Sequence, residues 1–333
     1  MIPITKEAIR ALPKIELHIH LEGTFSKEYV CELAEKLHVP LPRDKEHLFD
    51  FTCLAEFLEM LDWNCSLIRR GEDAEQLAYQ FAEYAKEEGI IYAEVILNPT
   101  HWKNISLEVL VPSVLAGFER AAQDGLTDCR LMVSLLRTQS TETARDTVEW
   151  LIGNPHPRLI GLSVDGNEEA AESNERFSPL FAKAKESGLH LTAHAGESSG
   201  PEGVWEALEL LQAERIDHGV RSVNDEKLMN YLKENHIPLN VCFTSNILCN
   251  IFTEENHPLK ALFDYGLVVT VSTDDPQILV DTMCYELEHI ASLYGWGMEE
   301  LIRLQYHAAE AVFCSEEKKE LLRGKIREFE SNC

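Results

Sequence analysis

The sequence contains few basic residues for its size. Its 333 residues include 30 lysines and arginines against 57 aspartates and glutamates, which gives a formal net charge of -27. A surface with this excess of negative charge repels the phosphate backbones of DNA and RNA, so we expect no nucleic-acid partner. A neutral small-molecule ligand is favoured over an anionic one. A local metal site is compatible with this charge, because the ion carries its own positive field.

The sequence also lacks a membrane-spanning run, a signal-peptide core and paired cysteines. No stretch reaches the roughly 18 uninterrupted apolar residues that a membrane span needs. Residues 1–14 carry charges at Lys6, Glu7 and Arg10 and contain no apolar segment of signal-peptide length. The 9 cysteines are scattered and include no Cys-x-x-Cys pair, which argues against a thiolate metal cage or a disulfide framework. We therefore expect a cytoplasmic protein without membrane contact.

No glycine-rich phosphate-binding turn follows the first predicted strand, which argues against an open dinucleotide-binding sheet. Strand-like apolar runs instead alternate with helical segments. The strand-like runs are residues 15–23, 91–97, 130–136, 159–164, 190–194, 215–218, 238–243 and 267–272. The helical segments are residues 26–37, 74–88, 106–124, 142–153, 176–187, 203–212, 224–234 and 258–265. This alternation predicts an α/β fold, a (β/α)8 TIM-type barrel formed by one domain over residues 1–333.

Two further segments are predicted to be helical additions to the barrel. In residues 51–70, apolar residues such as Phe57, Leu58 and Leu61 recur at helical spacing. Such a stripe is usually ordinary core, but its place between the first strand and its crossover helix is suited to a lid over the barrel mouth. Residues 298–330 are charge-rich and are expected to form a solvated helical extension at the C-terminus.

Polar residues gather where the predicted strands end. His18 and His20 stand at i and i+2 in the first strand, a spacing that points both imidazoles to one face. Alone, such a pair is more often structural than metal-binding. Other strands, however, also end in histidines and acids, namely Asp165, His194, Glu197, Asp217, His218, Asp274 and Asp275. Because buried carboxylates are rare unless paired or metal-bound, three histidines and an aspartate from this set predict a site for Zn²⁺ or a similar divalent ion.

Four segments carry a resemblance to a known family. PKIELHIHLEG, TAHAGE, RIDHG and STDDP, in this order and spacing, resemble the adenosine and adenine deaminases, which are metal-dependent amidohydrolases. The resemblance extends from about residue 12 to about residue 320. It implies one Zn²⁺ per chain, and the implied ligands are His18, His20, His194 and Asp274. It also implies catalysis by Glu197, which would protonate N1 of a purine, and by His218 and Asp274, which would orient the water that attacks C6.

The resemblance further implies a purine substrate, and the implied contacts are His20, Glu22, Gly166 and Asp275. Asp275 would contact N7, and the backbone N–H of Gly166 would contact N3. A capping or salt-bridged acid remains the alternative for Asp275, and a simple turn the alternative for Gly166. Glu22 stands where adenosine deaminases usually carry the aspartate that binds the ribose 5'-hydroxyl.

The substrate itself has three candidates. HLEGT and RIDHGVRS are more similar to the adenine deaminase branch, whereas the Asp165-Gly166-Asn167-Glu168 turn and the lid segment are more similar to the adenosine branch. Adenosine or 2'-deoxyadenosine is the favoured substrate. Adenine and a modified adenine nucleoside are the alternatives.

Other readings of the site are less well supported. A hydrolase acting on an ester, lactam or phosphoester would commonly use two metals and a bridging residue, and the fourth strand offers no convincing bridge. A non-enzymatic scaffold is disfavoured because Glu197 and His218 are both present. Asp217 is expected either to support the metal ligands or to form a simple salt bridge. The other histidines, among them His101 and His257, are expected to be structural or solvated, and no feature predicts an oligomeric state.

Overall fold

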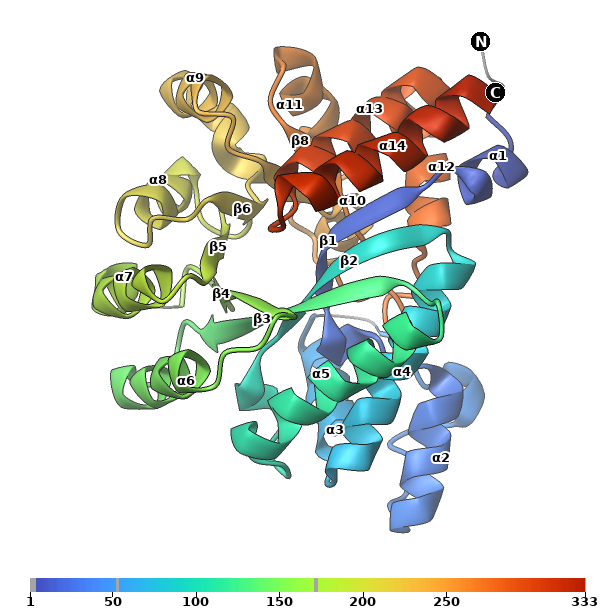
Figure 1. The fold of residues 1–333 in the computed structure, drawn as a ribbon, viewed down its shortest axis with the longest axis vertical. Helices are drawn as coiled ribbons and strands as arrows, with labels where there is room; N and C mark the ends of the chain where they lie inside the picture. The colour runs from blue at the N-terminus through green and yellow to red at the C-terminus, as the bar shows by residue number, and fades with distance from the viewer. Residues whose placement is uncertain (1–3, 52–53, 171–172, 333) are drawn as a thin grey trace.

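The computed structural model describes residues 4–51, 54–170 and 173–332. Eight parallel strands lie side by side in sequence order (Figure 1). They are β1 (Lys14–His20), β2 (Ile90–Leu97), β3 (Asp128–Leu136), β4 (Leu159–Asp165), β5 (His190–Ala195), β6 (Arg215–His218), β7 (Leu239–Val241) and β8 (Val269–Val271). Beyond β8, the backbone N–H of His20 donates to the carbonyl of Asp274 over 2.8 Å, which brings the two ends of the sheet together. The predicted (β/α)8 barrel is confirmed.

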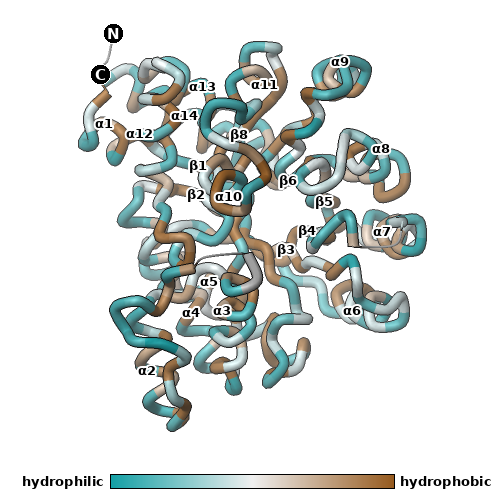
Figure 2. The backbone as a smooth tube through the Cα atoms, turned by 180° about the vertical axis from the view of Figure 1, so that it is seen from behind, coloured by the Kyte–Doolittle hydropathy of each residue, from teal (hydrophilic) through white to brown (hydrophobic). Residues whose placement is uncertain are grey.

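Helices surround the strands on the outside (Figure 1). The larger ones are α2 (Lys27–Leu37), α3 (Leu54–Ser66), α4 (Gly71–Glu87), α5 (Leu107–Gln123), α6 (Thr141–Gly153), α7 (Ser178–Glu186), α8 (Pro201–Glu209), α9 (Glu226–Glu234), α11 (Leu259–Tyr265), α12 (Met283–Tyr294), α13 (Met298–Ala311) and α14 (Glu316–Asn332). Two short helices, α1 (Lys6–Ala11) and α10 (Phe243–Leu248), complete the set, together with 3-10 turns that include η1 (Leu21–Gly23) and η3 (Pro99–His101). Hydrophobic and hydrophilic residues alternate along the outer helices (Figure 2), because only one stripe of each faces the strands.

Local sequence signals fix where several of these helices begin and end. Ser26 and Ser140 precede α2 and α6, and each hydroxyl accepts a backbone N–H from the first helical turn. Gly266 ends α11 in the left-handed conformation, with φ of 88°, which a side chain would disfavour. The strands are buried on both faces, as in β2, because helices cover them on the outside and side chains fill the barrel.

The two predicted additions differ in detail from the structure. Within residues 51–70 the helix is α3, and residues 52–53 lie outside the described residues. Residues 298–330 form two helices, and α13 packs on β1 and β8 with buried residues such as Leu301 and Leu304. A solvated extension therefore describes α14 but not α13, whose charged residues occupy only its outer face. Among the described residues, no helix combines the length and the apolar character needed to cross a membrane.

Candidate active site

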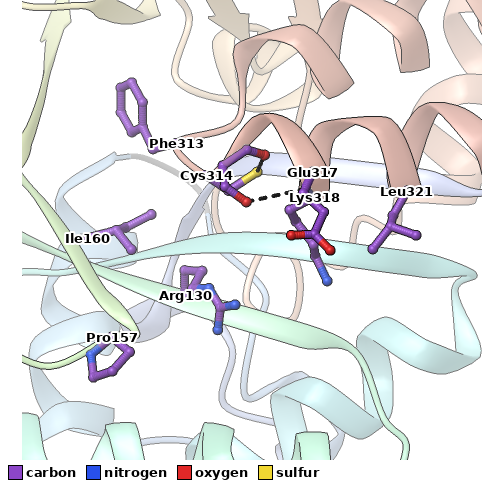
Figure 3. A pocket seen from close by; sticks show the side chains of 9 residues that line it. Arg130, Pro157, Ile160, Phe313, Cys314, Glu317, Lys318 and Leu321 are labelled. Carbon is purple, nitrogen blue, oxygen red and sulfur yellow. Dashed lines mark hydrogen bonds between the residues drawn. The ribbon is translucent and has the colours of Figure 1, made fainter.

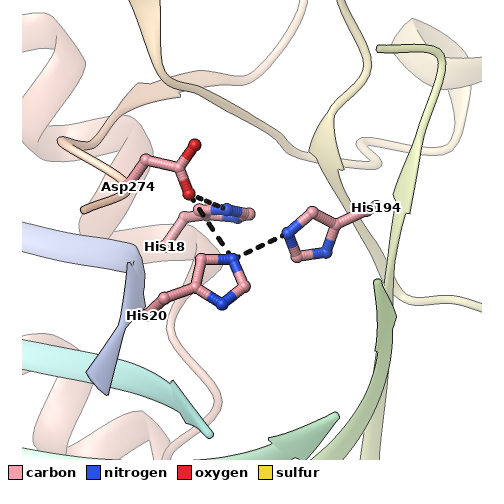
Figure 4. Close-up of side chains that lie close together, drawn as sticks. All are labelled: His18, His20, His194 and Asp274. Atoms are coloured by element: carbon pink, nitrogen blue, oxygen red, sulfur yellow. Dashed lines mark hydrogen bonds and ion pairs between the residues drawn. The ribbon is translucent and has the colours of Figure 1, made fainter. Parts of the chain in front are cut away.

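Three histidines and an aspartate converge at the C-terminal end of the barrel (Figure 4). His18 and His20 come from β1, His194 from β5, and Asp274 follows β8. His20 Nε2 lies 2.9 Å from His194 Nε2, and Asp274 Oδ1 lies 3.1 Å from His18 Nε2. One donor atom from each of the four side chains falls within 4.8 Å of the others. The structure therefore brings together the four residues that the sequence predicts to lie close to one another.

The electrostatics of this group fit a divalent cation. Burial lowers the pKa of His194 well below its ordinary value and also lowers that of His20, so both rings are neutral and offer lone pairs. Burial also opposes charge on His18, but the carboxylates of Asp217 and Asp274 outweigh it and raise the His18 pKa to about 10. A site that holds a proton this firmly has an excess of negative charge. A metal ion can take the place of that proton, and three imidazole nitrogens with one carboxylate form a donor set typical of Zn²⁺.

Asp217, at the end of β6, orients one of the candidate ligands. Its Oδ1 lies 3.1 Å from His18 Nδ1 and accepts a hydrogen bond from Asn240 Nδ2 over 2.8 Å, and its Oδ2 accepts one from Thr192 Oγ1 over 2.8 Å. A proton on His18 Nδ1 is thereby held toward Asp217, which leaves the Nε2 lone pair directed to the site. Of the two roles considered for Asp217, support of the metal ligands fits these contacts better than an isolated salt bridge.

Glu197 and His218 lie beside the metal-capable group. Glu197 Oε1 is 3.6 Å from His218 Nε2, and the His218 ring centroid is 4.8 Å from that of His18. Burial raises the pKa of Glu197, which favours the protonated carboxyl group, the form that can donate a proton. The backbones of His218 and Asp274 are left-handed, with φ of 63° and 69°. Such conformations in non-glycine residues are strained and concentrate at functional sites.

The loop that carries Glu197 is fixed by Glu168, whose role the sequence analysis did not identify. The Glu168 carboxylate follows β4 and accepts the backbone N–H groups of residues 196–199 over 2.9 to 3.1 Å, together with the Ser199 hydroxyl over 2.6 Å. Arg137 ties the same two strand ends, because its guanidinium donates to the carbonyls of Gly166 and His194. One acidic and one basic side chain thus join the ends of β4 and β5.

Glu22 and Asp275 occupy the neighbouring strand ends. Glu22 Oε1 accepts from the indole N–H of Trp102 over 2.6 Å and from the backbone N–H of Asn98 over 2.8 Å. Asp275 Oδ1 is buried without a hydrogen-bond partner among the described residues, and burial raises the Asp275 pKa well above its ordinary value. A side chain at Gly23 would meet Asp275 Oδ1 at 2.2 Å, so only glycine allows this close packing. Gly166, another predicted substrate contact, lies exposed at the end of β4, and its backbone is in the left-handed conformation.

The helix α3 is attached to the barrel mouth by ion pairs. Asp62 on α3 lies 2.8 Å from His101 Nδ1 and 2.6 Å from Lys103 Nζ, both in the segment that follows β2. Leu58 on the same helix is 47% exposed. α3 thus lies over the strand ends with an exposed apolar residue, as a lid would. The ion pair with Asp62 gives His101 a structural role, which is one of the two roles that the sequence predicts.

A separate hollow of about 400 Å³ lies at the opposite end of the barrel, near the starts of β3 and β4 (Figure 3). Its lining includes Arg130, Phe313 and Lys318. Asp128 already pairs with Lys318 over 2.6 Å and with Arg130 over 3.1 Å, so these cations are not free to bind an anion. This hollow therefore offers no unpaired arginine or lysine among the described residues that line it.

A model of the family described as adenosine deaminase matches residues 13–329. The chain belongs to the adenosine deaminase family. An adenine deaminase from Acinetobacter baylyi is 35% identical over 327 residues, which cover 94% of this chain and 96% of the relative. An adenosine deaminase from Pectobacterium atrosepticum is 31% identical over 327 residues, with 95% and 96% coverage. The family resemblance inferred from the four motifs is confirmed, and the chain is a hydrolytic deaminase.

Solved structures agree with this family assignment. The crystal structure of an adenine deaminase from Arthrobacter aurescens has a TM-score of 0.90 and 28% identity, and the match covers 96% of this chain and 99% of the other. An amidohydrolase from Burkholderia ambifaria, solved with bound Zn, has a TM-score of 0.91 and 26% identity, with 99% and 94% coverage. The whole barrel, including its extra helices, is thus the fold that this family uses.

Proposed function

We propose that this chain is a zinc-dependent enzyme that hydrolyses the 6-amino group of adenosine or 2'-deoxyadenosine to give inosine or 2'-deoxyinosine and ammonia. The observation that carries the proposal is the group of His18, His20, His194 and Asp274 next to Glu197 and His218. A Zn²⁺ ion held by the first four would acidify a water molecule and so supply a nucleophile near neutral pH. One ion per chain is expected, and elemental analysis of the purified protein measures it.

The side chains have distinct tasks in this proposal. Glu197, with its raised pKa, donates a proton to N1 so that the purine ring can accept electrons as the nucleophile adds to C6. His218 and Asp274 orient the attacking water, and Asp275, protonated in its buried setting, donates to N7. His20, one of the four residues that would hold the metal, would also contact the substrate, and Gly166 would present its backbone N–H to N3.

Adenine is a second candidate, and the surroundings of Glu22 favour it. Because one oxygen of this carboxylate is already held by Trp102 and Asn98, only the other remains for a ribose hydroxyl. That second oxygen is buried and has no hydrogen-bond partner among the described residues. A fixed, enclosed Glu22 leaves less freedom to accommodate a sugar than a mobile side chain would. A modified adenine nucleoside is the remaining alternative.

The deciding experiment compares kcat/KM for adenosine, 2'-deoxyadenosine and adenine by following loss of the 6-aminopurine chromophore. A higher value for either nucleoside supports the main proposal, and a higher value for adenine selects the second candidate. Zinc-loaded protein that deaminates none of the three contradicts both. Glu22→Asp in the same assay tests whether this side chain sets the preference, since the shorter carboxylate should raise the nucleoside-to-adenine ratio. A place in cytoplasmic purine salvage, suggested by the unpaired cysteines and the reaction, stays a prediction.

A further inference from the structure

Asn246 on α10 lies directly behind the two side chains that the proposed function places in catalysis. Its side chain is fully buried, with 0% of the residue exposed. The amide Nδ2 is 3.2 Å from Glu197 Oε1 and 3.3 Å from His218 Nδ1. On the other side, Oδ1 is 3.2 Å from His257 Nε2. One asparagine therefore contacts three titratable side chains, and the direction of its amide decides which of them receive a hydrogen.

His257 determines that direction. The backbone N–H of Leu259, which can only donate, is 3.2 Å from His257 Nδ1, so Nδ1 must be the acceptor. Burial lowers the pKa of His257 to about 3, and the rings of Phe243 and Phe252 pack around it, so the imidazole is neutral. Its single proton is therefore on Nε2 and is donated to Asn246. An amide oxygen must face His257, which agrees with the observed orientation and excludes the flipped one.

The two hydrogens of the Asn246 amide then point at Glu197 and His218. An NH2 group has one hydrogen for each of two acceptors, and both distances suit a hydrogen bond. His218 Nδ1 is thus an acceptor, and a neutral His218 carries its proton on Nε2. This Nε2 is the ring atom on the side of Glu197, 3.6 Å from its Oε1.

We propose that His257 and Asn246 are positioning residues that set the tautomer of His218 and hold the carboxyl group of Glu197. The inference rests on the proposed function, in which these two side chains act on the substrate and on water. It assigns His218 a definite role, because an Nε2–H group facing the reacting atoms is a hydrogen-bond donor and not a base. A series of hydrogen bonds thus runs from the backbone N–H of Leu259 to His257, from His257 to Asn246, and from Asn246 to His218.

Asn246→Asp tests the amide hydrogens with almost no change in shape. The oxygen that replaces Nδ2 accepts where the amide donated, so it draws a proton to His218 Nδ1 and disfavours the carboxylate that Glu197 becomes when it gives up its proton. We expect kcat to fall at least about tenfold while KM changes by less than about threefold, the pattern of an interaction that acts on the reaction step. In zinc-loaded protein with ¹⁵N-labelled histidine, long-range NMR correlations should show the His218 proton on Nε2 in the wild type and on Nδ1 in the variant. A His218→Gln spectrum identifies the signals.

A pair of variants at His257 separates hydrogen bonding from packing. His257→Gln keeps an N–H donor for Asn246 Oδ1 and should retain kcat within about threefold, whereas His257→Leu fills similar space without a donor and should lose about as much as Asn246→Asp. Asn174→Asp is the matched control, because Asn174 is also buried and donates its amide to a carboxylate, that of Glu206, over 3.0 Å. This control should keep wild-type kcat.

Several results would overturn the proposal. These are an Nδ1 proton on His218 in the wild type, wild-type kcat in Asn246→Asp, or equal loss in His257→Gln and His257→Leu. Equal loss in the Asn174→Asp control would also overturn it, because the effect would then follow from any buried aspartate. If the wild-type protein deaminates no aminopurine, the proposed function fails, and the NMR measurement alone then decides the tautomer. If Asn246→Asp does not fold, the two His257 variants decide.

Discussion

The carboxylate of Glu168 accepts the backbone N–H of Glu197 over 2.9 Å. It also holds the neighbouring N–H groups at Gly196, Ser198 and Ser199, so a residue after β4 determines where the proposed proton donor after β5 lies. An acidic side chain that takes several N–H groups at once acts as a rigid clamp on a loop, because each bond is charge-assisted. The catalytic loop thus depends on a residue that contacts neither metal ligands nor substrate in the proposed mechanism.

Glu168→Gln should lower kcat by about tenfold or more, because its NH2 group turns a donor toward N–H groups that also donate. Zinc content should stay at the wild-type value, since His194 belongs to β5 itself. In a Glu197→Gln background the same change should cost little more, and steady-state kinetics of the four proteins measure this. Glu206→Gln is the control, because Glu206 holds Asn174 through a similar set of N–H bonds away from Glu197. If Glu168→Gln lowers kcat by the same factor in the wild type and in Glu197→Gln, Glu168 does not act by positioning Glu197.

Glu197→Gln tests the proton donor itself. The amide keeps the size of the side chain but has no acidic proton, so the turnover of the 6-aminopurine should fall at least about 100-fold, the usual scale for a lost general acid. Folding, followed by circular dichroism, and zinc content should be unchanged. A variant with near-normal turnover would refute the assignment.

The adjacent acids Asp274 and Asp275 should respond differently to removal. Asp274 lies within 3.4 Å of His20 Nε2 and 3.1 Å of His18 Nε2, so Asp274→Ala should lose bound zinc. Asp275 packs against Gly23 and is not among the four residues whose donor atoms converge, so Asp275→Ala should keep zinc and mainly raise KM. Metal analysis of the two variants side by side is the measurement. Full zinc in Asp274→Ala would exclude its role as a ligand.

The parts of the site that follow strand geometry were predictable from the sequence. His18 and His20 share a face because a strand has a period of two, and His194 and Asp274 join them because parallel strands end at the same edge of a barrel. The eight-stranded fold followed from the same alternation. The sequence predicts a solvated extension where α13 lies, because the total charge of the segment hides the buried stripe of an amphipathic helix. It gives no prediction for α12.

The supporting residues were not predictable in the same way. The sequence predicts a structural or solvated His257 and assigns no role to Asn246, because the contact between them joins a helix after β7 to a loop that no periodic pattern links. Glu168 lies in the same turn as Gly166, but its partners are mainly backbone N–H groups, which no sequence pattern reveals. The position of Asn246 just beyond a strand end was the available signal.

Trp102→Phe should alter substrate preference. Phenylalanine keeps an aromatic ring against Phe25, whose centroid is 5.8 Å from that of Trp102, but it removes the N–H that holds Glu22. Glu22 Oε1, then held by the backbone N–H of Asn98 alone, can also accept from a ribose hydroxyl, and the ratio of kcat/KM for adenosine to that for adenine should rise several-fold, about the value of one ordinary hydrogen bond. An unchanged ratio would show that Glu22 does not respond to Trp102. Val109→Ala, at an exposed position on α5, is a control for general effects of truncation.

The pH dependence of stability should reflect Asp281, which lies in the segment after β8. Both of its carboxylate oxygens are buried without hydrogen-bond partners among the described residues. Burial, reinforced by the nearby carboxylates of Glu286 and Glu16, raises the Asp281 pKa far above its ordinary 3.8. The folded protein therefore keeps a proton that the unfolded chain releases. The resulting stabilisation is complete below the ordinary pKa and declines as pH rises toward the raised one.

Asp281→Asn removes this titration, because the amide is neutral at every pH. Relative to the variant, the wild type should lose unfolding free energy between about pH 5 and about pH 9. Urea unfolding of both zinc-loaded proteins at these two values measures the difference, and contributions from the metal site cancel because both proteins share it. Parallel curves for the two proteins would mean that Asp281 titrates normally in the fold. If the unfolding free energy of the wild type minus that of the variant falls as pH rises, Asp281 is an acid that the barrel keeps protonated.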